Sequence, residues 1–90
     1  MNLKNNRQRR IKELIERELQ SRQIEIKDNS HLHATHGNIK EGETETHLFI
    51  KIRSHKFKSL SKVEMHRLVY KILDEEFLKG LHAIELDLDN

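Results

Sequence analysis

Two short segments with strictly alternating hydrophobic residues most strongly limit the folds open to this chain. Residues 46–53 form the clearer of the two, with Leu48, Ile50 and Ile52 at every second position. The same alternation returns over residues 81–88. Side chains that alternate along a strand point to opposite faces of its sheet, so each predicted strand has one apolar and one more polar face. A sheet covered by helices on one face only therefore suits this chain.

Composition agrees with a small, one-sided fold. The chain has 90 residues, 34% of them hydrophobic and 36% charged. A chain of this length predicts one domain that buries roughly 60–65% of its unfolded surface. No apolar run exceeds three residues, so we expect no membrane span. The formal net charge is only +2, which makes the electrostatic case for a dedicated nucleic-acid binder weak.

The chain contains no cysteine. Disulfides and thiolate metal ligands are thereby excluded from it. The first seven residues lack the apolar core and small-residue cleavage site of a secretory signal. Together these features indicate an intracellular protein, which we expect in the bacterial cytoplasm.

Two helices are predicted. The first covers residues 8–20, where apolar residues recur at helical spacing, and residues 1–8 are expected to be frayed. Its early arginines are interpreted mainly as a solvated basic lead-in, with a phosphate-binding arm as the alternative. The second helix begins with a capping box at Ser61 and Glu64, ends near Gly80, and has a possible break near residues 74–75. Its predicted apolar stripe comprises Val63, His66, Val69, Tyr70, Leu73 and Phe77.

The order of elements brings histidines together. A strand over residues 23–27 precedes a long polar segment, residues 28–45, so the predicted order is α-β-β-α-β. The first two strands are most simply antiparallel, and the crossover to the last strand should be parallel and right-handed. The second and third strands then begin at the end of the sheet where the first strand ends and the long polar segment follows it. Five of the seven histidines are thus expected to gather there: His31, His33, His36, His47 and His82.

Each histidine also has a structural interpretation. His82 lies two residues before Ile84, so both side chains are predicted on the same, apolar face of the strand. A partly buried core histidine is therefore about as plausible as a metal ligand. His47 is interpreted first as a strand-end residue that hydrogen-bonds the loop. The three loop histidines could simply be solvated, because their spacing matches no standard zinc site. His66 is predicted to be structural, and His55 to lie on the surface.

Catalytic interpretations find little support. The chain has no cysteine nucleophile, no serine in a Gly-x-Ser-x-Gly elbow and no glycine-rich phosphate loop. Asp28, Glu41, Glu43 and Glu45 lie among the histidines but are too numerous to nominate an acid–base pair. We therefore expect a binding protein and no enzyme.

The chain resembles the BolA-like protein family. The resemblance covers roughly residues 10–88 and rests on the order and spacing of several segments. It is carried by residues 28–37 (DNSHLHATHG), 42–47 (GETETH), 54–57 (SHKF), 65–70 (MHRLVY) and 81–84 (LHAI). The resemblance implies one α+β domain over residues 1–90 with the αββ(α)αβ, class II KH-like fold: a three-stranded mixed sheet with helices packed on one face.

The resemblance also implies a partner and a cofactor. BolA-like proteins pair with a monothiol glutaredoxin, alone or around a shared [2Fe–2S] cluster to which glutathione contributes a thiolate. Such an adaptor acts in cluster trafficking or assembly, or in iron sensing, and is a monomer without tightly bound cofactor when alone. The implied metal ligands are His82 and, by alignment on Ser30, His33. His31, His36 and His47 are the further candidates, and imidazole ligation raises the reduction potential of such a cluster.

Two positions depart from the family pattern. Ser59 stands where the family usually has glycine in a Phe-x-Gly-x-Ser turn, and Met65 replaces the first arginine of Arg-His-Arg. The first departure leaves the geometry of the turn open, and the second removes one positive charge.

A transcription regulator that binds DNA through the KH-like fold is the alternative function, although the Gly-x-x-Gly clamp of KH domains is absent. Its candidate residues are Lys51, Arg53, Lys56, Lys58, Lys62 and Arg67. A zinc- or copper-binding loop that acts without glutaredoxin is a third possibility.

Overall fold

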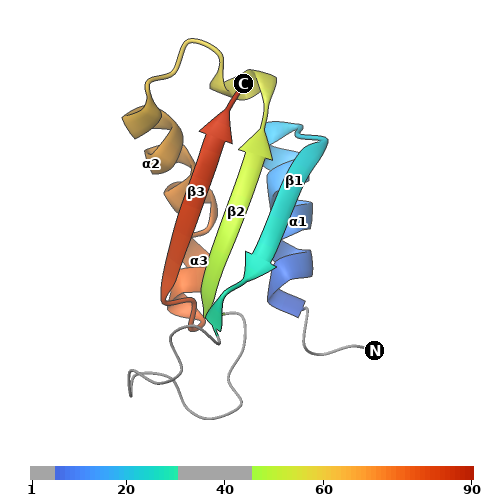
Figure 1. Ribbon diagram of the computed structural model, residues 1–90, viewed down its shortest axis with the longest axis vertical. Coiled ribbons are helices and arrows are strands. Elements are labelled where there is room, and N and C mark those ends of the chain that lie inside the picture. The colour runs from blue at the N-terminus through green and yellow to red at the C-terminus, as the bar shows by residue number, and fades with distance from the viewer. Residues whose placement is uncertain (1–5, 31–45) are drawn as a thin grey trace.

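A computed structural model of the chain describes residues 6–30 and 46–90, and shows a three-stranded sheet with its helices on one face (Figure 1). The strands are β1 (Gln23–Asp28), β2 (His47–Arg53) and β3 (Ala83–Asp89), in the order β1-β2-β3. β1 pairs with β2 antiparallel, and β2 pairs with β3 in parallel. This α+β architecture confirms the predicted fold class and the predicted strand directions.

The central strand explains why the sheet is one-sided. Leu48, Ile50 and Ile52 of β2 are buried, while the residues between them are only half-buried. The register places Ile52 opposite Ile24 and Ile50 opposite Leu86, so the apolar residues of three strands share one face. Burial of this face against the helices supplies the main driving force for folding, at roughly 25 cal/mol per Å² of apolar surface.

Helix α1 (Asn6–Leu19) covers this face with Ile11, Ile15 and Leu19, which are at most 2% exposed. Their i, i+4, i+8 spacing is the predicted amphipathic pattern. The helix begins two residues earlier than expected. The prediction of a frayed stretch over residues 1–8 is therefore wrong for residues 6–8, and residues 1–5 lie outside the described residues.

The crossover between β2 and β3 contains one 3-10 helix and two α-helices. The 3-10 helix η4 (His55–Phe57) places the Phe57 side chain in the core, at 0% exposure. Helix α2 (Lys62–Ile72) starts with the predicted capping box: Ser61 Oγ accepts from the Glu64 amide, and the Glu64 carboxylate accepts from the Ser61 amide. The predicted break occurs at Leu73, between α2 and α3 (Asp74–Leu78).

The predicted apolar stripe of α2 is only partly correct. Val69 and Leu73 are buried as expected, but Val63 is 58% and Tyr70 45% exposed, and Met65 is buried. Val63 and Tyr70 lie seven residues apart on a second face of the helix. The Tyr70 ring stacks on Phe77 of α3, with ring centroids 5.4 Å apart. The helix therefore carries one buried and one exposed apolar stripe.

The chain turns at Gly80 before β3. Gly80 has a φ of +115°, which L-residues rarely adopt, and it follows the end of α3 as predicted. Leu81 then returns to the core at 3% exposure. None of the helices among residues 6–30 and 46–90 has the length and apolar character that crossing a bilayer requires.

Candidate functional site

The end of the sheet at which β2 and β3 begin brings two histidine side chains together. β1 ends there as well, because it runs antiparallel to β2 (Figure 1). His47 is the first residue of β2, and His82 immediately precedes β3. The parallel register pairs His47 with Ala83, so the two histidines lie at the starts of neighbouring strands although they are far apart in sequence.

His47 and His82 are in direct ring contact. Their centroids are 5.5 Å apart and their planes make an angle of 77°, an edge-to-face arrangement. His82 is exposed, so its interpretation as a partly buried core histidine is wrong. The alternation of side chains along a strand would direct His82 toward the apolar face of the sheet. His82 lies just before β3, however, so this alternation does not determine its direction. The predicted convergence is confirmed for these two side chains.

His47 also has the structural role expected of a strand-end residue. It is half-buried, and its Nδ1 lies 3.2 Å from Thr46 Oγ1. Its backbone amide donates to Ser30 Oγ at 3.2 Å, and its carbonyl accepts from the Asn29 amide at 2.8 Å. These contacts fix the backbone of His47 at the end of the sheet where β2 begins. A fixed backbone restricts the ring to a few rotamers, which is what a ligating histidine requires.

Ser30 and Thr46 join the two chain ends between which residues 31–45 run. The buried Ser30 Oγ accepts from the Thr46 amide at 2.8 Å, and Asp28 Oδ1 accepts from the Ser30 amide at 2.9 Å. The second contact is an Asx turn, a local motif that the Asp-x-Ser spacing favours. The sequence analysis assigned no structural role to Asp28, Ser30 or Thr46, although short polar side chains at two strand ends were the available signal.

The remaining predicted ligands fall elsewhere. His33, His31 and His36 lie outside the described residues. Within the part of the chain that the structure describes, no three His, Asp or Glu side chains are grouped closely enough to hold a metal ion. This part of the chain therefore presents two imidazoles together and no third ligand of these types.

His66 and His55 have the roles that the sequence predicts. His66 is half-buried on α2, and its Nδ1 lies 2.8 Å from the Lys62 carbonyl oxygen, so this nitrogen carries the proton. His55 is exposed in η4. Neither histidine belongs to the end of the sheet where β2 and β3 begin.

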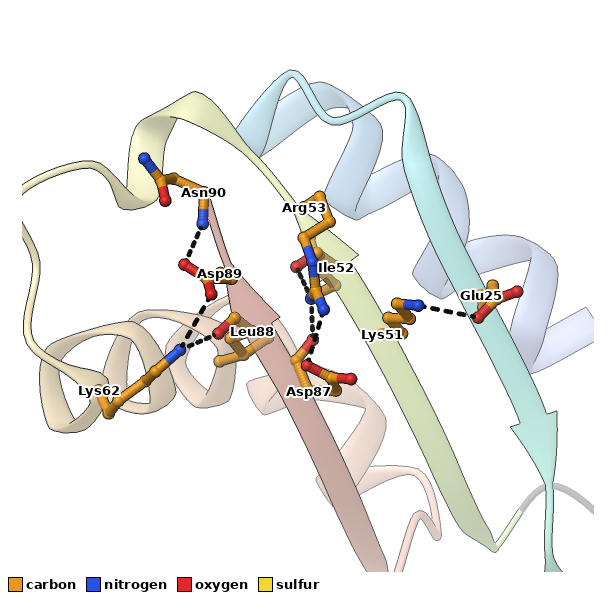
Figure 2. Close-up of polar contacts among 9 residues, drawn as sticks. All are labelled: Glu25, Lys51, Ile52, Arg53, Lys62, Asp87, Leu88, Asp89 and Asn90. Atoms are coloured by element: carbon orange, nitrogen blue, oxygen red, sulfur yellow. Dashed lines mark hydrogen bonds and ion pairs between the residues drawn. The ribbon is translucent and has the colours of Figure 1, made fainter.

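Three of the six basic candidates for nucleic-acid binding are paired with carboxylates. Figure 2 shows Lys51 with Glu25, Arg53 with Asp87, and Lys62 with Asp89. The shortest of these pairs, Arg53 Nη2 to Asp87 Oδ1, measures 3.0 Å. Lys56, Lys58 and Arg67 are exposed. The carboxylates offset much of the positive charge on this face of the sheet, which weakens its attraction for phosphates.

The early arginines of α1 have a structural role that sequence analysis missed. Glu76 of α3 is only 4% exposed and accepts two hydrogen bonds from Arg10, at 2.8 and 2.9 Å, and one from Arg7, at 3.1 Å. Arg7 also donates to the Lys79 carbonyl at 2.9 Å. These contacts correct the interpretation of Arg7 and Arg10 as a solvated lead-in. The two guanidiniums, with Arg10 contributing most, hold the pKa of Glu76 below its usual value of 4.5.

Two pockets at opposite ends of the strands differ in volume. A small pocket of about 120 Å³ lies beside His47, lined also by Asn29, Ala83 and Glu85 among others. A larger hollow of about 720 Å³ lies at the opposite end of the strands, around Arg53 and Asn90. The larger hollow is not near the paired histidines.

Known proteins resemble this chain along nearly its whole length. Protein BOLA1, chloroplastic, from Arabidopsis thaliana is 40% identical over 82 residues, which make up 90% of this chain and 51% of that protein. SufE-like protein 1, chloroplastic/mitochondrial, from the same plant is 38% identical over 80 residues, 86% of this chain and 22% of that protein. The chain thus spans about half and about a fifth of these relatives.

A bacterial protein and two solved structures are also similar to this chain. The DNA-binding transcriptional regulator BolA of Haemophilus influenzae is 36% identical over 78 residues, 87% of this chain and 71% of that protein. The BolA domain of SufE1 from Arabidopsis thaliana superposes with a TM-score of 0.83 at 37% identity, covering 93% of this chain and 91% of that structure. BolA1 from Arabidopsis thaliana gives 0.81 at 37% identity, covering 92% and 89%.

The family model for BolA-like proteins matches residues 15–89, which include all three strands, α2 and α3 and the last part of α1, residues 15–19. With the matching fold and the relatives above, this match identifies the chain as a member of the BolA family.

Proposed function

We propose that this chain is an adaptor that binds a monothiol glutaredoxin and contributes histidine ligands to a shared [2Fe–2S] cluster. We place this role in iron–sulfur cluster trafficking or iron sensing in the bacterial cytoplasm. One observation carries the proposal: in a BolA-family chain without cysteine, an exposed imidazole, His82, lies beside His47 at the end of the sheet where residues 31–45 depart. The presence of a bacterial relative supports the assignment to bacteria.

The donor set fits half of such a cluster. Each iron of a [2Fe–2S] cluster is tetrahedral and takes two protein ligands besides the two sulfides, so two imidazoles suffice for one iron. The other iron needs thiolates, which this chain lacks. A glutaredoxin cysteine and a glutathione thiolate supply that chemistry. Imidazole ligation at one iron raises the reduction potential above that of an all-thiolate cluster.

His82 is the first ligand in this proposal. Its backbone amide donates to the Thr46 carbonyl at 2.8 Å, which fixes the position of the residue while its ring stays exposed to a partner. His33 is the second ligand by family resemblance, with His31, His36 and His47 as the alternatives. Ser30 and Thr46 hold the end of β1 against the start of β2, because Ser30 Oγ accepts from the Thr46 amide.

A titration tests the proposal. The chain is added to a monothiol glutaredoxin loaded with glutathione and cluster, and visible absorption and circular dichroism are followed. We expect a new spectrum for the wild type and for His55→Ala, whose imidazole is exposed but remote from the site, and no new spectrum for His82→Ala. Analytical size exclusion separately reports whether a complex forms. An unchanged wild-type spectrum would refute the shared cluster, and a full response from His82→Ala would refute its role as ligand.

DNA binding is the second candidate. It is favoured by the name of the Haemophilus influenzae relative, a DNA-binding transcriptional regulator, and by the exposed Lys56, Lys58 and Arg67. A gel shift at physiological salt discriminates. A sequence-preferring complex that Lys56→Glu and Lys58→Glu abolish would support DNA binding, whereas weak, strongly salt-dependent retardation would count against it, because any basic surface produces that behaviour.

A further inference from the structure

We propose that the groove between α1 and the outer edge of β1 binds an extended, acidic segment of a partner protein, which adds to the sheet as a fourth strand. Figure 1 shows β1 as an end strand of the sheet, with α1 behind it. This inference goes beyond the proposed function, because it involves neither the paired histidines nor a cluster. Three features carry it: the direction of the backbone groups of β1, the apolar lining of the groove and the charge of the groove.

The outer edge of β1 directs backbone groups away from the sheet. The Asn29 amide donates to the His47 carbonyl, toward β2. Successive residues of a strand direct their backbone groups to opposite sides, so Ile24 and Ile26 direct theirs away from β2. Among the strands that the structure describes, none lies on that side of β1. Two amides and two carbonyls are therefore positioned to pair with an extended chain, as in strand addition.

The groove along this edge has an apolar base. It encloses about 390 Å³ and is lined by two isoleucines of β1 and three polar residues of α1: Ile24, Ile26, Gln8, Arg9 and Lys12. The two isoleucines belong to the apolar face of the sheet but are only half-buried, whereas their partners on β2, Ile52 and Ile50, are 0% exposed. An apolar side chain on the helix side of an added strand would cover the surface that they still expose, which favours binding.

The charge of the groove favours an acidic segment. Its lining includes Arg9 and Lys12 and no carboxylate. Both side chains are exposed, and within residues 6–30 and 46–90 neither forms an ion pair. Carboxylates on the helix side of an added strand would meet these two cations. A nucleic-acid phosphate would also be attracted, but a phosphate has no hydrogen-bond donor for the outward carbonyls of β1 and no apolar group for the base of the groove.

A second copy of the chain fits this edge less well. Antiparallel pairing of two β1 strands about a two-fold axis makes one continuous sheet, with both α1 helices on the same face. Arg9 and Lys12 of each copy would then approach those of the other across the shared edge. Like charges brought together in this way oppose the pairing. The occupant that the groove favours is therefore a different chain of opposite charge.

The outer edge of β3 provides a contrast. Lys62 of α2 donates to the Leu88 carbonyl on the side of β3 away from β2 (Figure 2). β3 also carries three carboxylates, those of Glu85, Asp87 and Asp89. A lysine at a strand edge and negative charge along the strand both oppose the addition of an acidic strand. The acidic segment should therefore add to β1 and leave β3 unchanged.

Titration of the full-length, ¹⁵N-labelled chain with a synthetic peptide tests the proposal. The probe is a capped heptapeptide, Thr-Asp-Thr-Val-Thr-Asp-Thr, whose side chains on one face are a valine between two aspartates. We expect it to slow solvent exchange of the Ile24 and Ile26 amides, because these amides acquire carbonyl partners. The outward amides of Ile84 and Leu86 on β3 should be unaffected. The same peptide with lysine in place of aspartate is the control and should not bind.

Charge-reversal variants test the role of the two cations. The double variant Arg9→Glu with Lys12→Glu should weaken binding of the acidic peptide at least tenfold, because it replaces attraction by repulsion. Arg17→Glu with Lys71→Glu changes the net charge equally at exposed positions outside the groove, and should leave the affinity within about twofold. Far-ultraviolet circular dichroism shows whether both variants keep the fold, which is expected because all four side chains are exposed.

Each remaining outcome contradicts the proposal. Unchanged exchange of the Ile24 and Ile26 amides at millimolar peptide would exclude strand addition, and so would equal affinity of the two double variants. Light scattering without peptide should give a monomer; a dimer that protects these amides would assign the edge to a second copy. Displacement of the peptide by a short DNA duplex at physiological salt would assign the groove to phosphates. None of these results depends on the glutaredoxin titration, since no glutaredoxin is present.

Discussion

Ser59 holds a backbone conformation that L-residues adopt only at a cost. Its φ is +71°, in the left-handed region, in the turn between η4 and α2. The family usually has glycine at this point, so the chain keeps a glycine-type turn with a residue that carries a Cβ. The geometry that the sequence left open is therefore resolved. A non-glycine residue in this region costs roughly 1 kcal/mol or more, because its Cβ approaches the neighbouring carbonyl.

Substituting Ser59→Gly should consequently stabilise the protein by about 1 kcal/mol. Urea unfolding followed by circular dichroism measures the change in the free energy of unfolding. Lys58→Gly is the matched control: Lys58 has a φ of −57°, so glycine there gains no relief and should destabilise by about 0.5 kcal/mol. Equal effects of the two substitutions would show that the left-handed backbone of Ser59 carries no strain.

At the scale of elements, Glu76 connects α1 to α3. Its buried carboxylate accepts from Arg7 and Arg10, and Arg7 also caps the carbonyl of Lys79 just beyond α3. Cations near the start of α1 oppose the dipole of that helix but favour the C-terminal end of α3. Because the start of α1 packs against the end of α3, Arg7 and Arg10 have favourable partners there.

Removing the Glu76 charge should weaken this connection. We expect Glu76→Gln to lower the free energy of unfolding by about 2 kcal/mol at pH 7, because two guanidiniums lose their carboxylate; the value is below that for a fully buried pair, since the Arg10 side chain is 44% exposed. Glu75→Gln, at an exposed neighbouring position, is the control and should change stability by less than about 0.5 kcal/mol.

The pH dependence of this effect follows from the pKa of Glu76. The arginines lower it from 4.5 in the folded protein, so the folded state binds a proton less readily than the unfolded state. The stabilisation is therefore complete above pH 4.5 and is lost as pH falls through the depressed folded value. The difference between wild type and Glu76→Gln should narrow below pH 4.5. A difference that stays constant down to pH 3 would rule out the ion pairs as its cause.

At the scale of the whole molecule, the sequence predicts what local pattern and connection rules determine. The Ser61–Glu64 capping box is a local motif, and it forms as predicted. A strand-helix-strand connection normally joins parallel strands, so β2 and β3 begin at the same end of the sheet. The approach of His47 to His82 could therefore be predicted without coordinates. The confirmed part of the candidate site thus depends on topology more than on any single motif.

Other features have no local signal. Glu76 accepts hydrogen bonds from Arg10 and Arg7, which precede it by 66 and 69 positions in the sequence. Nothing in the sequence next to Glu76 distinguishes it from Glu75. Apolar spacing alone places Val63 and Tyr70 on the buried stripe of the helix, because it cannot separate two stripes on one helix, and both side chains are exposed. The rotation of α2 about its axis is set by the core that it packs against, and this rotation places Met65 among the buried residues.

The parallel pairing of β2 with β3 has a consequence for the order of folding. His47 and His82 meet only after the whole crossover, η4, α2 and α3, has closed, because their strands have no short connection. Closure of such a long chain segment is entropically costly and belongs to the later stages of a folding reaction. The paired imidazoles are thus a property of the completed chain.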